Sequence, residues 1–280
     1  MDTEHLEAAD LPQLITAIEQ GPFLDYSVGI CRLREGKLAF LGTGVLIKKG
    51  GRCGILTAHH CLHACVPSVC LGRSGGDELF LVLRCGHSVR VKPEEAVERV
   101  LVQPHSAEFG PDLTFIEILA VERRGSLAAI GSFFPLDGRL GEIVEDFGKI
   151  GTPIVSIGFP EEKNTQRPKG TGIALKISAM LLGPSAIQNG DISEKDGWDY
   201  VVSHCNDVGS IRLPTSFRGF SGGPVWGMKL RKHKLDGHIT IENAALIGIN
   251  FYEMDGLSEE RLMRAHFIKS IYDLAWKNLS

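Results

Sequence analysis

The sequence lacks the features that would mark a membrane protein or a nucleic-acid-binding protein. It contains no run of about 18 apolar residues, so we expect no membrane-spanning helix. Neither sign of charge dominates, because 30 Lys and Arg residues stand against 34 Asp and Glu residues, which leaves a formal charge of −4. That balance gives no electrostatic basis for binding nucleic acid or an anionic membrane. We therefore expect neither of them as a partner.

An export signal is also missing from the N-terminus. The first ten residues, M-D-T-E-H-L-E-A-A-D, carry acidic groups where a secretory signal has Lys or Arg, and no apolar run follows them. The cysteines are odd in number, seven in all: Cys31, Cys53, Cys61, Cys65, Cys70, Cys85 and Cys205. Without an export signal, an odd count favours free thiols in a reducing compartment over a disulfide framework. We therefore expect a cytoplasmic protein.

Helical periodicity is scarce between the two ends of the chain. About a dozen short apolar runs, separated by turns rich in glycine, predict an all-β barrel or sandwich rather than a parallel α/β sheet. A short amphipathic helix is expected at 11–20, begun by a capping box of Asp10 and Gln13. A second helix is expected from Ser258 onward. Its expected buried residues are Leu262, Ile268, Ile271 and Ala275.

The resulting organisation has four parts. We expect an N-terminal helical extension at 1–24, a first β-domain at 25–125, a second at 126–257 and a C-terminal helix at 258–280. The stretch 123–148 is the best candidate for the connection between the two β-domains.

Residues 57–65 read T-A-H-H-C-L-H-A-C, a density of ligand-type side chains that raises the question of a metal site. Structural zinc sites usually show paired knuckles in two separate places, and the pair that we consider here is Cys61 and Cys65. Zinc remains an alternative, but we expect no metal. We expect His59 and His63 to be neighbours on a turn or short helix, and Cys61, Cys65 and Cys70 to be small buried hydrophobic residues.

Three motifs occur in an order that suits nucleophilic catalysis. T-A-H-H-C contains His60, P-D-L-T-F-I-E-I begins with Asp112 after its proline, and R-G-F-S-G-G-P-V-W contains Ser221. A serine needs a base such as histidine, and the histidine needs a carboxylate that orients it. A glycine-rich turn can also aim main-chain amides at a developing oxyanion, here those of Gly219 and Ser221.

These motifs are similar to T-A-A-H-C, D-I-A-L-L and G-D-S-G-G-P, so the chain resembles the chymotrypsin-fold (trypsin-like) serine proteases over about 25–280. I-G-F-P at 157–160 is similar to the V-G-Y-P element of glutamyl endopeptidase-like members, and the style is that of those proteins and of high-temperature-requirement proteases. The resemblance implies two six-stranded antiparallel β-barrels, the first with His60 and Asp112 and the second with Ser221. It also implies a serine endopeptidase that acts on proteins or peptides and needs no cofactor.

The chain departs from this family pattern at several positions. Secreted members bridge the cysteine after the catalytic histidine to a position that is about Gly42 here, and a second family cysteine is replaced by Phe217. Phe220 replaces the aspartate that receives a newly cleaved N-terminus in zymogens, so we expect no activation by such cleavage. Another contact must then hold the oxyanion turn. The N-terminal helix, the loops 161–171 and 184–197, or an activating partner or ligand could provide it.

Spacing from Ser221 places the substrate-binding positions at Thr215, Ser216, Asn250, Phe251, Tyr252 and Glu253. No aspartate lies at the expected pocket floor, which disfavours strong selection for Arg or Lys. Asn250 stands where relatives that cleave after Glu or Gln place a histidine, which leaves a small or polar residue open. The alternative to an enzyme is a catalytically silent barrel of this family that acts as a protein-binding module.

Overall fold

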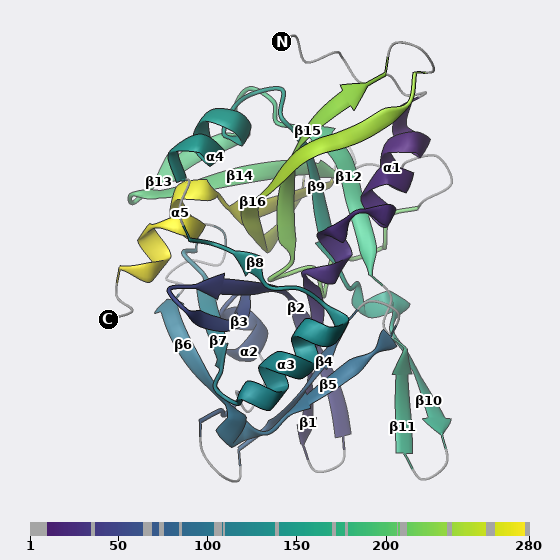
Figure 1. Cartoon of the computed structure of the whole chain (residues 1–280), viewed down its shortest axis with the longest axis vertical. Coiled ribbons are helices and arrows are strands. Elements are labelled where there is room, and N and C mark those ends of the chain that lie inside the picture. Colours follow the sequence, from purple (N-terminus) through teal and green to yellow (C-terminus); the bar gives the residue numbers. More distant parts are fainter. Residues whose placement is uncertain are drawn as a thin grey trace.

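Two antiparallel β-sheets packed against each other make up most of the molecule (Figure 1). The computed structural model describes residues 10–34, 37–63, 69–72, 76–83, 86–103, 108, 110–137, 140–169, 172–176, 179–205, 207, 212–233, 237–255 and 261–277. The first sheet occupies the lower half of Figure 1 and the second sheet the upper half.

The first sheet has the strand order β5-β4-β1-β2-β3-β7-β6, and β8 pairs with β2. Its strands are β1 (Ser27–Arg34), β2 (Lys37–Lys49), β3 (Arg52–Thr57), β4 (Glu78–Val82), β5 (Ser88–Val91), β6 (Ala96–Val102), β7 (Leu113–Ile118) and β8 (Phe134–Pro135). The short helix α2 (His60–His63) follows β3, and α3 (Val121–Ile130) follows β7.

The second sheet has the order β12-β9-β15-β16-β17-β14-β13. Its strands are β9 (Pro153–Gly158), β12 (Met180–Ala186), β13 (Ile192–Lys195), β14 (Trp198–Cys205), β15 (Pro224–Lys232), β16 (Ile239–Asp255) and β17 (Arg261–His266). A separate hairpin, β10 (Thr165–Lys169) and β11 (Gly172–Lys176), projects at the lower right of Figure 1. The remaining α-helices are α1 (Leu11–Gln20), α4 (Leu140–Phe147) and α5 (Ile268–Tyr272), with short 3₁₀ turns at Pro22–Asp25, Pro93–Glu95, Glu161–Lys163 and Leu274–Trp276.

The prediction of a mostly β chain with antiparallel sheets is therefore confirmed. The six-stranded closed barrels are not: among the described strands, the hydrogen-bonded path of each of the two large sheets has two open ends and contains seven strands. The extra strands are short additions at the edges or off the main path. One is the two-residue strand β8, and another is β13, which pairs only with β14 through four residues.

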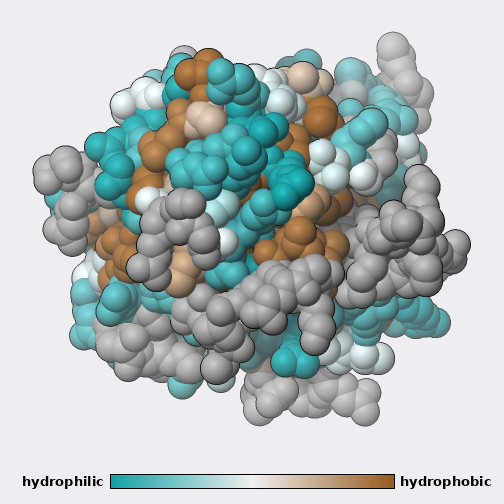
Figure 2. Space-filling view, turned by 90° about the horizontal axis from the view of Figure 1, so that it is seen from below, coloured by the Kyte–Doolittle hydropathy of each residue, from teal (hydrophilic) through white to brown (hydrophobic). Residues whose placement is uncertain are grey.

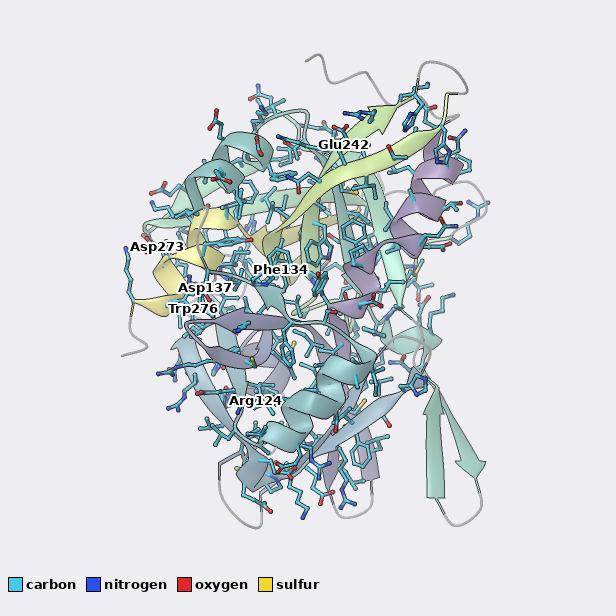
Figure 3. All side chains as sticks on the ribbon, viewed as in Figure 1. Arg124, Phe134, Asp137, Glu242, Asp273 and Trp276 are labelled. Atoms are coloured by element: carbon cyan, nitrogen blue, oxygen red, sulfur yellow. The ribbon has the colours of Figure 1, made fainter. Side chains whose placement is uncertain are left out.

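The largest hydrophobic core lies where the two sheets face each other. It joins Val45 and Phe115 of the first sheet to Val225 and Trp226 of the second. Trp226 is only 1% exposed, and its ring meets that of Phe134 edge-on at 5.1 Å. Phe134 lies at the junction of the two halves in Figure 3. Burial of this apolar surface stabilises the packing of one sheet on the other.

A half-buried lysine also crosses this junction. Lys49 Nζ donates to the carbonyls of Leu136 at 3.1 Å and Tyr272 at 2.8 Å, and so ties the end of β2 to α5. Burial lowers the pKa of Lys49, and the carboxylates of Asp137 and Asp273 partly oppose that shift. Both carboxylates lie at the same end of the junction in Figure 3.

The N-terminal helix has the predicted bounds, but its predicted capping box is absent. Asp10 has helical backbone angles and makes no side-chain cap. Its carboxylate instead accepts a hydrogen bond from Lys232 Nζ at 3.0 Å. This ion pair ties the start of α1 to the far end of β15.

The predicted C-terminal helix is wrong over residues 261–266. These residues form β17, which pairs with β14 on one side and β16 on the other. The segment lacks Gly and Pro, which favours a helix. Pairing with the edges of β14 and β16 overrides that weak local preference. Helix α5 begins only at Ile268, and Ile268, Ile271 and Ala275 are buried as expected.

The predicted connection at 123–148 lies between β7 and β9 and contains α3, β8 and α4. The proposed domain boundary at 125/126 falls inside α3, whose Leu127 side chain is buried in the core of the first sheet. Viewed from the end that the first sheet occupies, the surface mixes hydrophobic and hydrophilic groups (Figure 2). Among the described residues, no helix is both long and apolar enough to cross a membrane.

Candidate active site

His60 and Asp112 come together because β3 and β7 are antiparallel neighbours. Thr57, the last residue of β3, is paired with Thr114 of β7, so His60 follows one strand at the point where Asp112 precedes the other. His60 Nδ1 lies 2.5 Å from Asp112 Oδ2, and the His60 amide donates to Asp112 Oδ1 at 3.0 Å. The carboxylate thus fixes both the ring and the backbone of His60.

Asp112 is held as an anion by its surroundings. Burial raises the pKa of this carboxyl group, but the hydrogen bonds and positive field of His60 outweigh burial and hold the pKa below its usual value. The His60 side chain is 36% exposed and the Asp112 side chain 6%. A histidine open to a substrate and oriented by a buried carboxylate is the arrangement that a general base requires.

His266, at the end of β17, is a site residue that the sequence did not reveal. Its Nε2 accepts a hydrogen bond from the Asp112 amide at 2.9 Å. The ring is fully buried and stacks on Phe251 with centroids 4.6 Å apart. Burial lowers the pKa of His266 to about 3, against the opposing field of the Asp112 carboxylate. The ring is therefore neutral, and its proton resides on Nδ1.

Ser221 lies in a tight turn that ends where β15 begins. Gly219 and Gly222 both have positive φ, +96° and +82°. A Cβ on Gly219 would lie 2.4 Å from the Phe159 carbonyl oxygen, so only glycine fits there. Among the described residues, the amides of Gly219 and Ser221 donate to no protein acceptor. Two unused amides on one turn are what an oxyanion site requires.

Contacts from the first sheet hold this turn in place. The Thr43 amide of β2 donates to the Ser221 carbonyl at 2.9 Å, and Thr43 Oγ1 donates to the Gly219 carbonyl at 2.6 Å. From the loop after β9, the Glu161 amide donates to the Arg218 carbonyl at 2.8 Å. Glu161 belongs to the loop 161–171, one of the segments expected to support the turn. Thr43 was not expected to do so.

Gly42 lies opposite Cys61, at the position where secreted members of the family carry the second cysteine of the disulfide. A Cβ on Gly42 would lie 2.7 Å from Cys61 Sγ. Cys61 Sγ instead donates to the Ser221 carbonyl at 3.3 Å, which brings the residue beside His60 against the serine turn. Cys61 is buried as expected, whereas Cys70 is only half-buried. Cys65 and Cys85 lie outside the described residues.

The I-G-F-P motif has a packing reason in this structure. A Cβ on Gly158 would lie 2.2 Å from the ring of Phe220, so glycine makes room for the side chain that precedes the nucleophile position. Phe220 is fully buried and meets Phe217 edge-on at 5.7 Å. An apolar contact therefore occupies the place of the zymogen-type aspartate.

Of the predicted pocket-floor residues, Thr215 is exposed and Ser216 is half-buried. Both the amide and the hydroxyl of Thr215 donate to Glu162, at 2.8 and 2.5 Å. Glu253, from the opposite strand, accepts from the Phe217 amide at 3.1 Å and also pairs with Arg261. The predicted floor and wall are therefore linked, and Glu253 has a cation beside it.

The other three predicted positions lie along β16. Asn250 is fully buried, and its main chain exchanges hydrogen bonds with the serine turn: its amide donates to Gly223 O at 2.9 Å and its carbonyl accepts from Gly222 N at 2.7 Å. Phe251 is buried against His266, and Tyr252 is half-buried. β16 therefore positions the turn as well as the wall.

Comparison with known families decides the identity of this arrangement. The family model described as "Trypsin-like peptidase domain" matches residues 42–229, which is more than half of the chain. The chain belongs to the trypsin-like peptidase family. The matched range contains the His60, Asp112 and Ser221 motifs.

Solved structures of other proteins also resemble this chain, and 161 of their chains match it significantly. One is an HtrA-type protease AlgW with decapeptide, with 12% identity, a TM-score of 0.46, and coverage of 98% of this chain and 68% of that one. Another comes from a study of the Sesbania mosaic virus VPg protein, with 12% identity, a TM-score of 0.43 and coverage of 89% and 88%. At these scores neither supports an inference about this chain. No curated protein matches it significantly.

Proposed function

We propose that this trypsin-like peptidase domain is a serine endopeptidase. Ser221 Oγ attacks the scissile carbonyl of a protein or peptide, and His60 takes the serine proton as general base. His60 then gives a proton to the leaving amine, while Asp112 orients the ring and stabilises its charged form. The amides of Gly219 and Ser221 stabilise the tetrahedral oxyanion.

The observation that carries this proposal is the His60–Asp112 pair, with an Nδ1–Oδ2 distance of 2.5 Å, beside a serine turn that has two unused amides. The carboxylate holds the proton of the neutral ring on Nδ1, which leaves Nε2 to act as the base. The Cys61–Ser221 contact supports the same geometry, because it brings the neighbour of His60 to 3.3 Å from the Ser221 main chain.

The proposal includes a turn that needs no N-terminal cleavage. Thr43 and Glu161 support it through hydrogen bonds, and buried Phe220 replaces a salt bridge. An activating partner or ligand is then an added control rather than a requirement of the fold. Gly42 opposite Cys61 supports a location where disulfides do not form, and we propose the cytoplasm.

A fluorophosphonate probe tests the proposal directly, because it reacts with an activated serine. Wild-type protein should be labelled at Ser221, as located by peptide mapping. Ser221→Ala and His60→Gln should abolish labelling, whereas Ser126→Ala, a change on the distant helix α3, should leave it intact. Absence of labelling in the folded wild type would instead favour the silent binding module. Labelling at any other serine would refute the assigned nucleophile.

A further inference from the structure

A second cluster of titratable side chains lies beside the His60–Asp112 pair and takes no part in the proposed catalysis. His59 immediately precedes α2 and His63 is its last residue, and their rings stack with centroids 4.1 Å apart. The expectation that they are neighbours on a turn or short helix is therefore confirmed. Both rings face Glu98 of β6, a residue and a strand that the sequence analysis did not single out.

The three side chains converge on one carboxylate oxygen. Glu98 Oε1 lies 2.8 Å from His63 Nε2 and 3.5 Å from His59 Nδ1. The ligand atoms of all three residues lie within 4.8 Å of one another. Thr114 Oγ1 donates to the same oxygen at 3.0 Å, which orients the carboxylate in the way that outer-shell groups orient metal ligands.

His59 provides the independent sign that something is missing from this cluster. Its side chain is only 9% exposed, yet its buried Nδ1 makes no hydrogen bond within the described residues. A buried polar nitrogen without a partner is costly, so it calls for a group that would satisfy it. Nδ1 lies near Glu98 Oε1 without adequate hydrogen-bond geometry.

The cluster offers a cation one carboxylate and two imidazole rings. Within the described residues no Lys or Arg pairs with Glu98, whose carboxylate faces the two histidine rings and accepts a hydrogen bond from the Thr114 hydroxyl. A divalent ion could bind one nitrogen from each neutral ring and the carboxylate, and leave its remaining position to water.

We propose that His59, His63 and Glu98 form a binding site for a divalent transition-metal ion of the Zn²⁺ type. Two imidazoles and a carboxylate are a ligand set that Zn²⁺ uses with an open fourth position. Zn–N bonds of about 2.0–2.1 Å place two tetrahedral ligand atoms about 3.3 Å apart, so His63 Nε2 and Glu98 Oε1 must separate slightly from 2.8 Å, which the half-exposed His63 side chain allows. This site differs from the Cys61–Cys65 pair that the sequence suggested, and it revises the expectation that no metal is bound.

The site would act on the segment that carries His60. His59 is joined to His60 by a peptide bond, and His63 closes the same helical turn. A bound ion would therefore brace α2 against β6, in addition to the contact between His60 and Asp112. Metal binding is measurable whether or not the chain is a protease, so the failure of one proposal is distinguishable from the failure of the other.

Isothermal titration of Zn²⁺ alone into untagged, chelator-treated protein tests the proposal. Wild type should bind one ion per chain in a saturable transition, because three ligand side chains converge on one point. His63→Gln and Glu98→Gln should each weaken binding by about tenfold or more. The double variant His233→Gln/His238→Gln removes an exposed histidine pair from the β15–β16 hairpin and should bind as wild type does.

Two further readouts keep the test decisive. Substituted Co²⁺ should show the intense visible absorption of a low-coordination site in wild type and lose it in Glu98→Gln. Thermal melting without metal checks that each variant is folded. No stoichiometric binding to folded wild type would overturn the proposal. Equal affinity in wild type, His63→Gln and Glu98→Gln would also overturn it.

Discussion

Lowering the pH from about 7.5 to about 4.5 should weaken the fold through His266, the buried residue that supports Asp112. The pKa of His266 is about 3 in the folded chain and 6.5 in a solvated histidine. The unfolded chain therefore binds a proton that the folded chain does not bind between these two values. The contribution of neutral His266 to the free energy of unfolding is fully present above about pH 6.5, and it is lost as the pH falls through this window.

The size of the effect follows from the width of the window. Each pH unit inside it corresponds to about 1.4 kcal/mol, so His266 alone should remove about 3 kcal/mol by about pH 4.5. Solvent does not screen this group, because the side chain is fully buried. This is a large fraction of the free energy of unfolding of a typical domain, which is roughly 5–15 kcal/mol.

His266→Gln isolates this contribution from that of the carboxylates. The carboxamide oxygen can still accept the Asp112 amide but does not titrate in this range. Urea unfolding at both pH values should show a fall in the free energy of unfolding that is about 3 kcal/mol larger in wild type than in the variant. Equal falls in the two proteins would refute the reasoning. If the variant does not fold, NMR of the wild type gives the answer, because a His266 ring that titrates near pH 6 contradicts it.

Three other changes should have separate effects. Asp112→Asn should lower kcat by on the order of 10⁴-fold in a peptide-cleavage assay, because the amide no longer fixes the ring tautomer or stabilises the imidazolium; a kcat within tenfold of wild type would contradict this. Thr43→Val removes the hydroxyl that supports the Gly219 carbonyl and should cost about 1–3 kcal/mol in urea unfolding, with kcat falling more than KM changes. Unchanged stability and kcat would remove Thr43 from the support of the turn. Lys49→Met should lower stability by about 1–3 kcal/mol, because two buried carbonyls lose their donor, and an unchanged urea midpoint would show that water replaces it.

Much of the candidate site could be predicted from motifs because its chemistry dictates local sequence. The glycines around Ser221 are required by positive φ and by close approach of backbone, so they appear as a recognisable string. His60 and Asp112 each adjoin a strongly apolar strand, and antiparallel pairing of those strands brings them together. Order along the chain was therefore enough to predict their contact.

The contributions of β6 and β17 could not be predicted in this way. β17 has weak alternation, and it is a strand only because β14 and β16 offer edges on both sides of it. Because His266 is the last residue of β17, its place in the site could not be predicted either. β6 carries the run A-V-E-R-V-L-V, whose three valines favour a strand, but nothing in it connects Glu98 to His63, 35 residues earlier. Long-range register, rather than local pattern, places both residues.

The division of the site between the two sheets has a consequence for any activity measurement. His60 and Asp112 adjoin strands of the first sheet, whereas Ser221 and His266 belong to the second. A slight separation of the halves would misalign the reacting groups while every strand stayed intact. Turnover should then decline at lower urea concentrations than far-ultraviolet circular dichroism does. The catalytic rate would therefore report on the alignment of the two sheets more sensitively than a probe of secondary structure does.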